Sequence, residues 1–178
     1  MKSVHRDIGP KKITTYEEAL QCVQEDGDLY RHLTDEFKNR KEIILAAVSN
    51  KPLVIFHIPS VFKDDRDIVF AAAKQDGRIL IGWNIPDHFK KDPEIVLAAV
   101  MSHGVALQYA HEDLQKDRII VLAAVKQDGV AFQYVYHTLK IDRQIAYTAM
   151  INTNLHGGPP DSKSLIDGCL IVCMRRLK

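Results

Sequence analysis

The hydrophobic residues of this chain recur in short runs at nearly constant intervals. The run Lys-Glu-Ile-Ile-Leu-Ala-Ala-Val at 41–48 is followed by close copies at 66–73, 93–100 and 118–125. The Ala-Ala pairs of these four copies are 25, 27 and 25 residues apart, and more divergent copies lie at 17–23 and 143–150. The pattern predicts about six tandem units, each too short to bury its apolar face alone.

Polar residues mark where each apolar run begins and ends. An aspartate whose side chain can accept from the free N–H groups of a new helix precedes four of the runs, at Asp65, Asp92, Asp117 and Asp142. The residues that follow the runs are Gly27, Pro52, Gly77, Gly104, Gly129 and Asn154. Glycine and asparagine adopt the left-handed conformation that closes many helices. We therefore expect a helix of about eleven residues in each unit, closed by this stop.

A second, shorter element follows each stop. In the segments 105–114 and 130–139, the apolar residues fall at helical spacing. Pro59 and Pro86 interrupt the equivalent segments of two middle units, where we expect a short helix and a further turn. No segment shows the period-two alternation of a strand. The predicted fold class is all-α, a right-handed-type α-solenoid of about six 25-residue helical repeats with a C-terminal capping helix.

The ends of the chain differ from the repeats. Residues 1–12 are polar and basic and are expected to form a flexible tail, followed by a repeat domain over 13–154. In the last part, 155–178, the breaker His-Gly-Gly-Pro-Pro at 156–160 precedes a predicted helix over 163–177. Apolar residues occupy most of the circumference of that helix, which favours a cap on the open end of the solenoid. A helix that binds a membrane surface or a partner is the alternative.

The repeat resembles a known family. Residues 117–134 read Asp-Arg-Ile-Ile-Val-Leu-Ala-Ala-Val-Lys-Gln-Asp-Gly-Val-Ala-Phe-Gln-Tyr, which is similar to the repeat of the domain of unknown function 4116 family. The resemblance covers about residues 40–150, with departures at 49–52, at 101–104 and in a two-residue insertion near Trp83. The family forms tandem arrays and has no assigned activity. The resemblance therefore implies a repeat fold and no catalytic residue, cofactor or substrate.

Composition narrows the class of protein. The chain has 178 residues, is 46% hydrophobic and carries a formal net charge of +1. It is therefore too apolar for disorder and lacks the basic field of a nucleic-acid-binding protein. No apolar run approaches the ~20 residues of a membrane span. Three cysteines do not form a disulfide framework, so we expect a cytoplasmic or other reducing intracellular compartment, with import into an organelle as the alternative.

No catalytic, cofactor or metal site is predicted. The eight histidines form no metal-binding motif, and His103 and His137 are expected to be solvated near turns. Cys169 and Cys173 are expected to pack as small apolar residues, and Cys22 to lie in the core. The charged residues between units alternate in sign, which favours solvated surfaces that cap helices and pair locally over an RNA-binding ridge.

Equivalent positions of neighbouring units form the candidate partner-binding site. Stacking the units brings together a column of aromatic and polar side chains, and the residues assigned to binding are Phe56, His57, Trp83, Asn84, Tyr109 and Tyr134. Phe56 and Trp83 stand where the regular units have glutamine, so they indicate a surface aromatic patch, with burial of both rings as the alternative. The predicted function is a non-enzymatic protein–protein interaction module or scaffold. A small structural subunit of a large assembly is the alternative, and an enzyme with a site at a repeat junction has no supporting motif.

Overall fold

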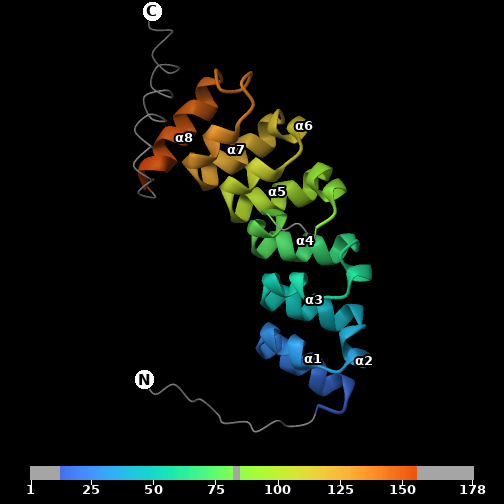
Figure 1. The fold of residues 1–178 in the computed structure, drawn as a ribbon. Helices are drawn as coiled ribbons and strands as arrows, with labels where there is room; N and C mark the ends of the chain where they lie inside the picture. Colours follow the sequence, from blue (N-terminus) through green and yellow to red (C-terminus); the bar gives the residue numbers. More distant parts are fainter. Residues whose placement is uncertain (1–12, 82–84, 156–178) are drawn as a thin grey trace, which may run out of the picture.

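The chain folds into a curved stack of short helices (Figure 1). The structure, a computed structural model, describes residues 13–81 and 85–155. Every regular element within these ranges is helical, and none of those helices combines the length and the apolar character needed to cross a membrane. The predicted tail at 1–12 and the predicted final helix at 163–177 lie outside the described residues.

Each unit contributes one long α-helix to the stack. These long helices are α1 (Tyr16–Glu25), α3 (Lys41–Asn50), α4 (Arg66–Gln75), α5 (Pro93–Ser102), α7 (Arg118–Gln127) and α8 (Arg143–Leu155). Short 3₁₀-helices follow them, namely η1 (Gly27–His32), η2 (Pro52–Phe56), η4 (Gly77–Ile81), η6 (Gly104–Tyr109) and η7 (Gly129–Tyr134). A further turn precedes the next long helix, as α2 (Asp35–Lys38), η3 (Ser60–Phe62), η5 (Asp87–Lys91) or α6 (Glu112–Gln115). Figure 1 places α2 and α6 along the same edge of the stack.

The second element is more broken than its apolar spacing predicts. The expected continuous helix over 105–114 is wrong, because η6 ends at Tyr109, Ala110 has extended backbone and α6 begins only at Glu112. The side-chain amide of Gln115 donates to the carbonyl oxygens of Leu107 and Ala110, both at 3.1 Å. These bonds satisfy the end of a 3₁₀-helix, which is stable only over a few residues. The second element is therefore interrupted in this unit although the segment contains no proline.

The four predicted N-terminal aspartates are confirmed as caps. The Oδ1 atom of Asp117 accepts from the backbone N–H groups of Ile119 at 2.8 Å and Ile120 at 3.2 Å. Asp65, Asp92 and Asp142 accept in the same way from the second and third residues of α4, α5 and α8. The start of each of these helices is thus encoded by one side chain.

The core is a continuous column of apolar side chains between the long helices and the 3₁₀-helices. In α3 the buried residues are Ile43, Ile44, Ala47 and Val48, and α4, α5 and α7 bury the equivalent four positions. The five 3₁₀-helices that directly follow a long helix each add a large buried residue, in order Tyr30, Ile55, Leu80, Leu107 and Phe132. Cys22 is only half-buried, so the prediction that it lies in the core is wrong. It occupies the alanine column of α1, which no described unit precedes.

The glycines after the long helices serve a different purpose from the one expected. None of Gly27, Gly77, Gly104 and Gly129 has the positive φ of a left-handed stop. The residue before glycine closes the helix instead, as at Asp76, where φ is −147° and ψ is 102°. A Cβ atom on Gly27 would lie 2.5 Å from the Ala47 carbonyl oxygen, and the other three glycines meet the equivalent alanine of the next long helix even more closely. The glycines therefore permit close stacking of one unit on the next.

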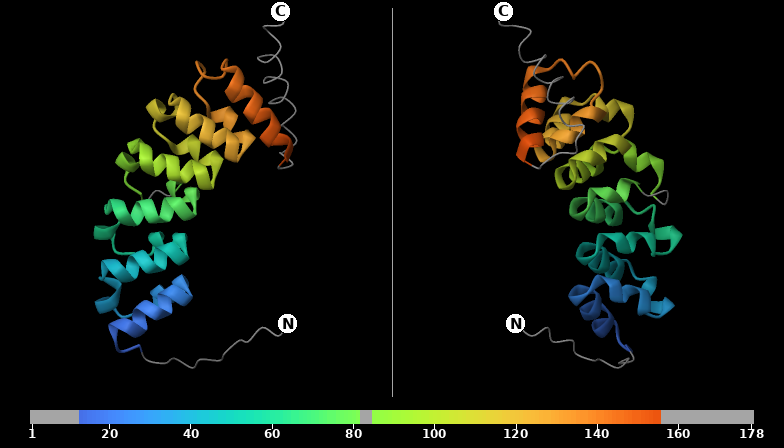
Figure 2. Two further views of the ribbon diagram at one scale, coloured as in Figure 1. Left: turned by 180° about the vertical axis from the view of Figure 1, so that it is seen from behind. Right: turned by 60° about the vertical axis from the view of Figure 1, so that its left-hand side comes forward.

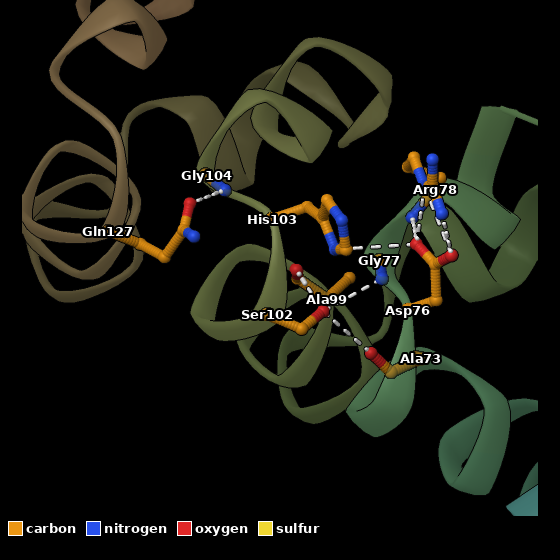
Figure 3. A network of polar contacts seen from close by, with 9 residues as sticks. All are labelled: Ala73, Asp76, Gly77, Arg78, Ala99, Ser102, His103, Gly104 and Gln127. Carbon is orange, nitrogen blue, oxygen red and sulfur yellow. Dashed lines mark hydrogen bonds and ion pairs between the residues drawn. The ribbon is translucent and has the colours of Figure 1, made fainter. Parts of the chain in front are cut away.

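A polar side chain accepts a hydrogen bond from the glycine N–H at three of these close approaches. The N–H of Gly77 donates to Ser102 Oγ at 2.7 Å, and that hydroxyl is 3.1 Å from the carbonyl oxygen of Ala73 (Figure 3). Asn50 Oδ1 accepts from Gly27 at 2.9 Å, and Gln127 accepts from Gly104. Pro52 replaces the glycine of its unit and has no N–H to donate. Neighbouring units are thus joined through side chains at the C-terminal ends of the long helices.

The charged residues at the N-terminal ends join the units on the opposite edge. Lys41 Nζ lies 2.7 Å from Asp65 and 2.8 Å from Asp67, both in the next unit. Arg66 pairs in the same way with Asp92 and Glu94, and Arg118 Nε is 2.9 Å from Asp142. The prediction that the aspartates among these residues cap helices is confirmed. Local pairing is confirmed for Lys90 with Asp87 and for Lys116 with Glu112, whereas Arg66 and Arg118 pair with the next unit.

The last long helix is longer than predicted. Asn154 does not stop it, because α8 continues through Leu155. α8 has 13 residues where the other long helices have 10.

Candidate interaction surface

The long helices expose one face, and this face is the same in every unit. In α5 it consists of Glu94, Leu97, Ala98 and Met101, which follow the spacing i, i+3, i+4, i+7 of one helix surface. Figure 2 shows the long helices side by side along the stack, so their exposed faces form one extended surface. The alanine of this face is half-buried in α3, α4, α5 and α7. Because its side chain is small, the middle of the surface lies lower than its edges.

Large apolar side chains gather on this face from α4 onward. We define the apolar patch as Phe70, Leu97, Met101, Ile119, Tyr147 and Ile151. Met101 is 65% exposed, Ile119 72% and Tyr147 54%. Exposed apolar side chains that gather on one face of a protein usually mark a contact site. The patch is therefore the strongest candidate for a binding surface.

A pocket opens in this patch between α4 and α5. Its volume is about 540 Å³, and it is lined by Phe70, Lys74, Glu94, Leu97, Ala98, Met101 and Ser102. The volume falls in the range that admits several side chains of a partner. Methionine can rearrange without strain, so Met101 is suited to shaping the pocket around an incoming group.

The sequence carries a signal for this patch. A ten-residue helix cannot bury its entire circumference in a two-layer stack, so part of each Ile/Val/Leu run must lie at the surface. Two residues of each unit lie on the outer face. One directly precedes the Ala-Ala pair, and the other lies three positions after the first alanine of that pair. In α5 these are Leu97 and Met101.

The structure brings together part of the predicted partner-binding site. Tyr109 ends η6 and Tyr134 ends η7, and these two 3₁₀-helices contact each other. Both rings are half-buried against the core, as is Phe56 at the end of η2, whereas His57 is exposed. Phe56 and the two tyrosines thus contribute to packing as well as to the surface. Trp83 and Asn84 lie outside the described residues. Partner binding by this column stays a prediction.

The buried carboxylate of Asp76 lies at the junction of the long helices α4 and α5. Asp76 is 5% exposed and accepts from Arg78, with the shortest contact 2.7 Å from Nη2 to Oδ2 (Figure 3). Burial by itself would raise the pKa of Asp76, but the Arg78 hydrogen bonds and the nearby His103 outweigh it and hold this pKa below its usual value. Asp76 is therefore an anion held by its neighbours, which suits a structural role.

His103 is not simply solvated, as predicted, but completes this junction. Its Nδ1 atom is buried and lies 3.3 Å from Asp76 Oδ1, although the angle is poor for a hydrogen bond. The side chain is 35% exposed, so its other edge reaches solvent. His137 is exposed, as expected. Within 13–81 and 85–155, no group of three or more metal-binding side chains comes together.

Comparison with known proteins agrees with the repeat architecture. A family model described as Domain of unknown function (DUF4116) matches residues 16–60, 40–82, 83–115 and 117–155. These matches span the long helices α1 to α8. No curated protein and no solved structure matches the chain. Because the matched segments cover most of the sequence, the chain belongs to the DUF4116 domain family.

Proposed function

We propose that this chain is a non-enzymatic interaction module, a right-handed α-solenoid of six units with its final helix as a cap, that binds a protein partner. The observation that carries the proposal is the apolar patch on α4, α5, α7 and α8. An exposed Met, Tyr and Ile set on adjoining rigid helices has the composition of an interface core. The polar groups described above support the same proposal. Arg66 pairs with Asp92 and Asp76 lies 3.3 Å from His103, so these groups are engaged in joining neighbouring units.

The rigidity of the patch favours specific binding of a partner over non-specific adhesion. Its residues lie on α-helices whose backbone groups are satisfied internally and whose opposite faces are buried. The surface is thus already organised before a partner arrives, which reduces the entropy lost on binding. Met101 and Tyr147 also belong to residue types that are enriched at protein interfaces.

Affinity purification of the tagged full chain from its own cell tests the proposal. We expect one or a few proteins to co-elute near stoichiometry and to be identified by mass spectrometry. Met101→Asp should remove them, whereas Val61→Asp, at a 73% exposed apolar residue of η3, should not. Unchanged melting temperatures of both variants establish that folding is intact. A solitary chain of 20.2 kDa would contradict the proposal.

The same preparation separates a binding module from a structural subunit. A module is expected to exist partly as free chain in size-exclusion chromatography of the lysate. A structural subunit is expected only within one large particle. Companions that survive Met101→Asp would show that another surface makes the contact, and the column containing Phe56 and Tyr109 is the next to test.

A further inference from the structure

The charges around the apolar patch indicate the chemistry of its partner, and this inference rests on the proposed function. Lys74 of α4 and Lys126 of α7 occupy equivalent positions near the C-terminal ends of their helices, and Met101 holds that position in α5 between them. Both lysines are exposed. Neither amine forms an ion pair with another side chain in 13–81 or 85–155.

The acidic residues at the other edge of the same face are already engaged in ion pairs, in which one cation is shared by two carboxylates. Asp67 of α4 pairs with Lys41, and Glu94 of α5 pairs with Arg66. In α7 the equivalent position is the apolar Ile119. At the edge that carries Lys74 and Lys126, the charge without an ion-pair partner is therefore positive. A partner that places carboxylates there gains both attraction and selectivity.

The floor of the patch favours a helical partner over an extended one. The floor is built from side chains of α-helices, whose backbone N–H and C=O groups bond within each helix. An extended peptide would lay its own backbone polar groups on an apolar surface that offers no partners for them. A helix satisfies those groups internally and presents only side chains.

We propose that the apolar patch binds an amphipathic α-helix of a partner protein, with carboxylates flanking the apolar face of that helix. Neighbouring packed helices are about 8–10 Å apart, so Lys74 and Lys126, two helices apart, are separated by about 16–20 Å. At 1.5 Å per residue, this distance matches an α-helix of about 11–13 residues. The central apolar residues of that helix contact Met101 and fill the pocket between α4 and α5.

A displayed library of 16-residue helical peptides tests this assignment directly, with the full chain as the bait. We expect enriched peptides to carry apolar residues at i, i+3 or i+4, and i+7, with Asp or Glu in the first and last turns. Their affinity, measured by fluorescence anisotropy, should fall at least tenfold on Met101→Asp and remain unchanged on Val61→Asp. The double change Lys74→Glu with Lys126→Glu should reverse the preference, so that peptides with flanking lysines bind better.

Each contrary result overturns the inference in a recognisable way. Failure to enrich any helical peptide, or enrichment without a preference for acidic flanks, would remove the proposed partner chemistry. Equal binding to wild type and Met101→Asp would place the contact elsewhere. A concentration-dependent dimer of the wild type that Met101→Asp abolishes would identify the occupant as a second copy. In all these cases a companion that still co-purifies with the chain would leave the interaction module itself standing.

Discussion

Gly77 lies so close to Ala99 that a Cβ atom at residue 77 would overlap the Ala99 carbonyl oxygen. This relationship explains why glycine after one helix and the second alanine of the next helix recur together. The alanine keeps its helix near the stack, and the glycine lets the preceding chain pass against its carbonyl group. Two of the most regular features of the repeat are therefore the two sides of one contact.

Replacement of Gly77 by alanine should destabilise the chain by about 2–3 kcal/mol, because the clash involves backbone atoms that cannot move aside. The same change at Gly27 should cost less. That glycine meets the Ala47 carbonyl oxygen at 2.5 Å, less closely than Gly77 meets that of Ala99, and lies in a unit near the end of the stack. Urea unfolding measures both. Equal stability of Gly77→Ala and wild type would refute the close-approach explanation.

Ser102→Ala should lower the free energy of unfolding by about 1–2 kcal/mol, since it leaves the Gly77 N–H without its acceptor at 2.7 Å. Gln75 offers a matched control at the equivalent position of α4. The unit before α4 has Pro52 at the position equivalent to Gly77, so no backbone N–H is available for Gln75 to accept from. Gln75→Ala should therefore change the free energy of unfolding by less than about 0.5 kcal/mol. Similar losses for both variants would show that the side-chain bond is not what joins the units.

Variants of Asp92 can distinguish the contribution of helix capping from that of ion pairing. It accepts from two N–H groups at the start of α5 and also pairs with Arg66 at 2.8 Å. Asp92→Ala should cost about 1–2 kcal/mol, because both are lost. Asp92→Asn keeps a capping oxygen and loses the charge, so its cost should stay below about 1 kcal/mol and should shrink in high salt. Thermal melts at low and high salt measure this difference, and equal costs would contradict it.

Acid should weaken the stack through Asp76. The pKa of this carboxyl is held below 3.8 in the folded chain, against burial, by hydrogen bonds from Arg78 and by His103. A depressed folded-state pKa contributes stability that is present above the unfolded value and is lost as pH falls through the folded value. We expect the urea midpoint to fall as pH drops below about 4. Asp76→Asn should flatten that fall, and an unchanged slope would contradict the assignment.

The periodicity and the aspartate caps could be predicted because both are local. Asp65 and Asp92 act on the two or three residues that follow them, so position alone identifies their role. The glycines illustrate the limit. A glycine after a helix commonly marks a left-handed stop, and only the neighbouring unit reveals that Gly77 is needed for the approach to Ala99.

The candidate surface was harder to predict than the helix caps, because the exposure of its residues depends on contacts between units. Phe56 and Tyr109 are predicted to share one column of the surface, with burial of the Phe56 ring as the alternative, and both rings are half-buried against the core. Phe70 lies within an apolar run and Met101 directly follows one, and the sequence alone does not tell which face of each long helix is buried. Their exposure follows from the two-layer architecture, in which the 3₁₀-helices cover only one face of each long helix.

Photo-crosslinking in the source cell tests the interaction module most directly. A photoreactive amino acid is placed at residue 101 in one variant and at residue 61 in another, since both native side chains are well exposed, at 65% and 73%. We predict one discrete adduct from residue 101, of the mass of the chain plus one partner, and none from residue 61. Adducts from residue 61 alone, or from neither position, would contradict the claim that the apolar patch is the contact surface.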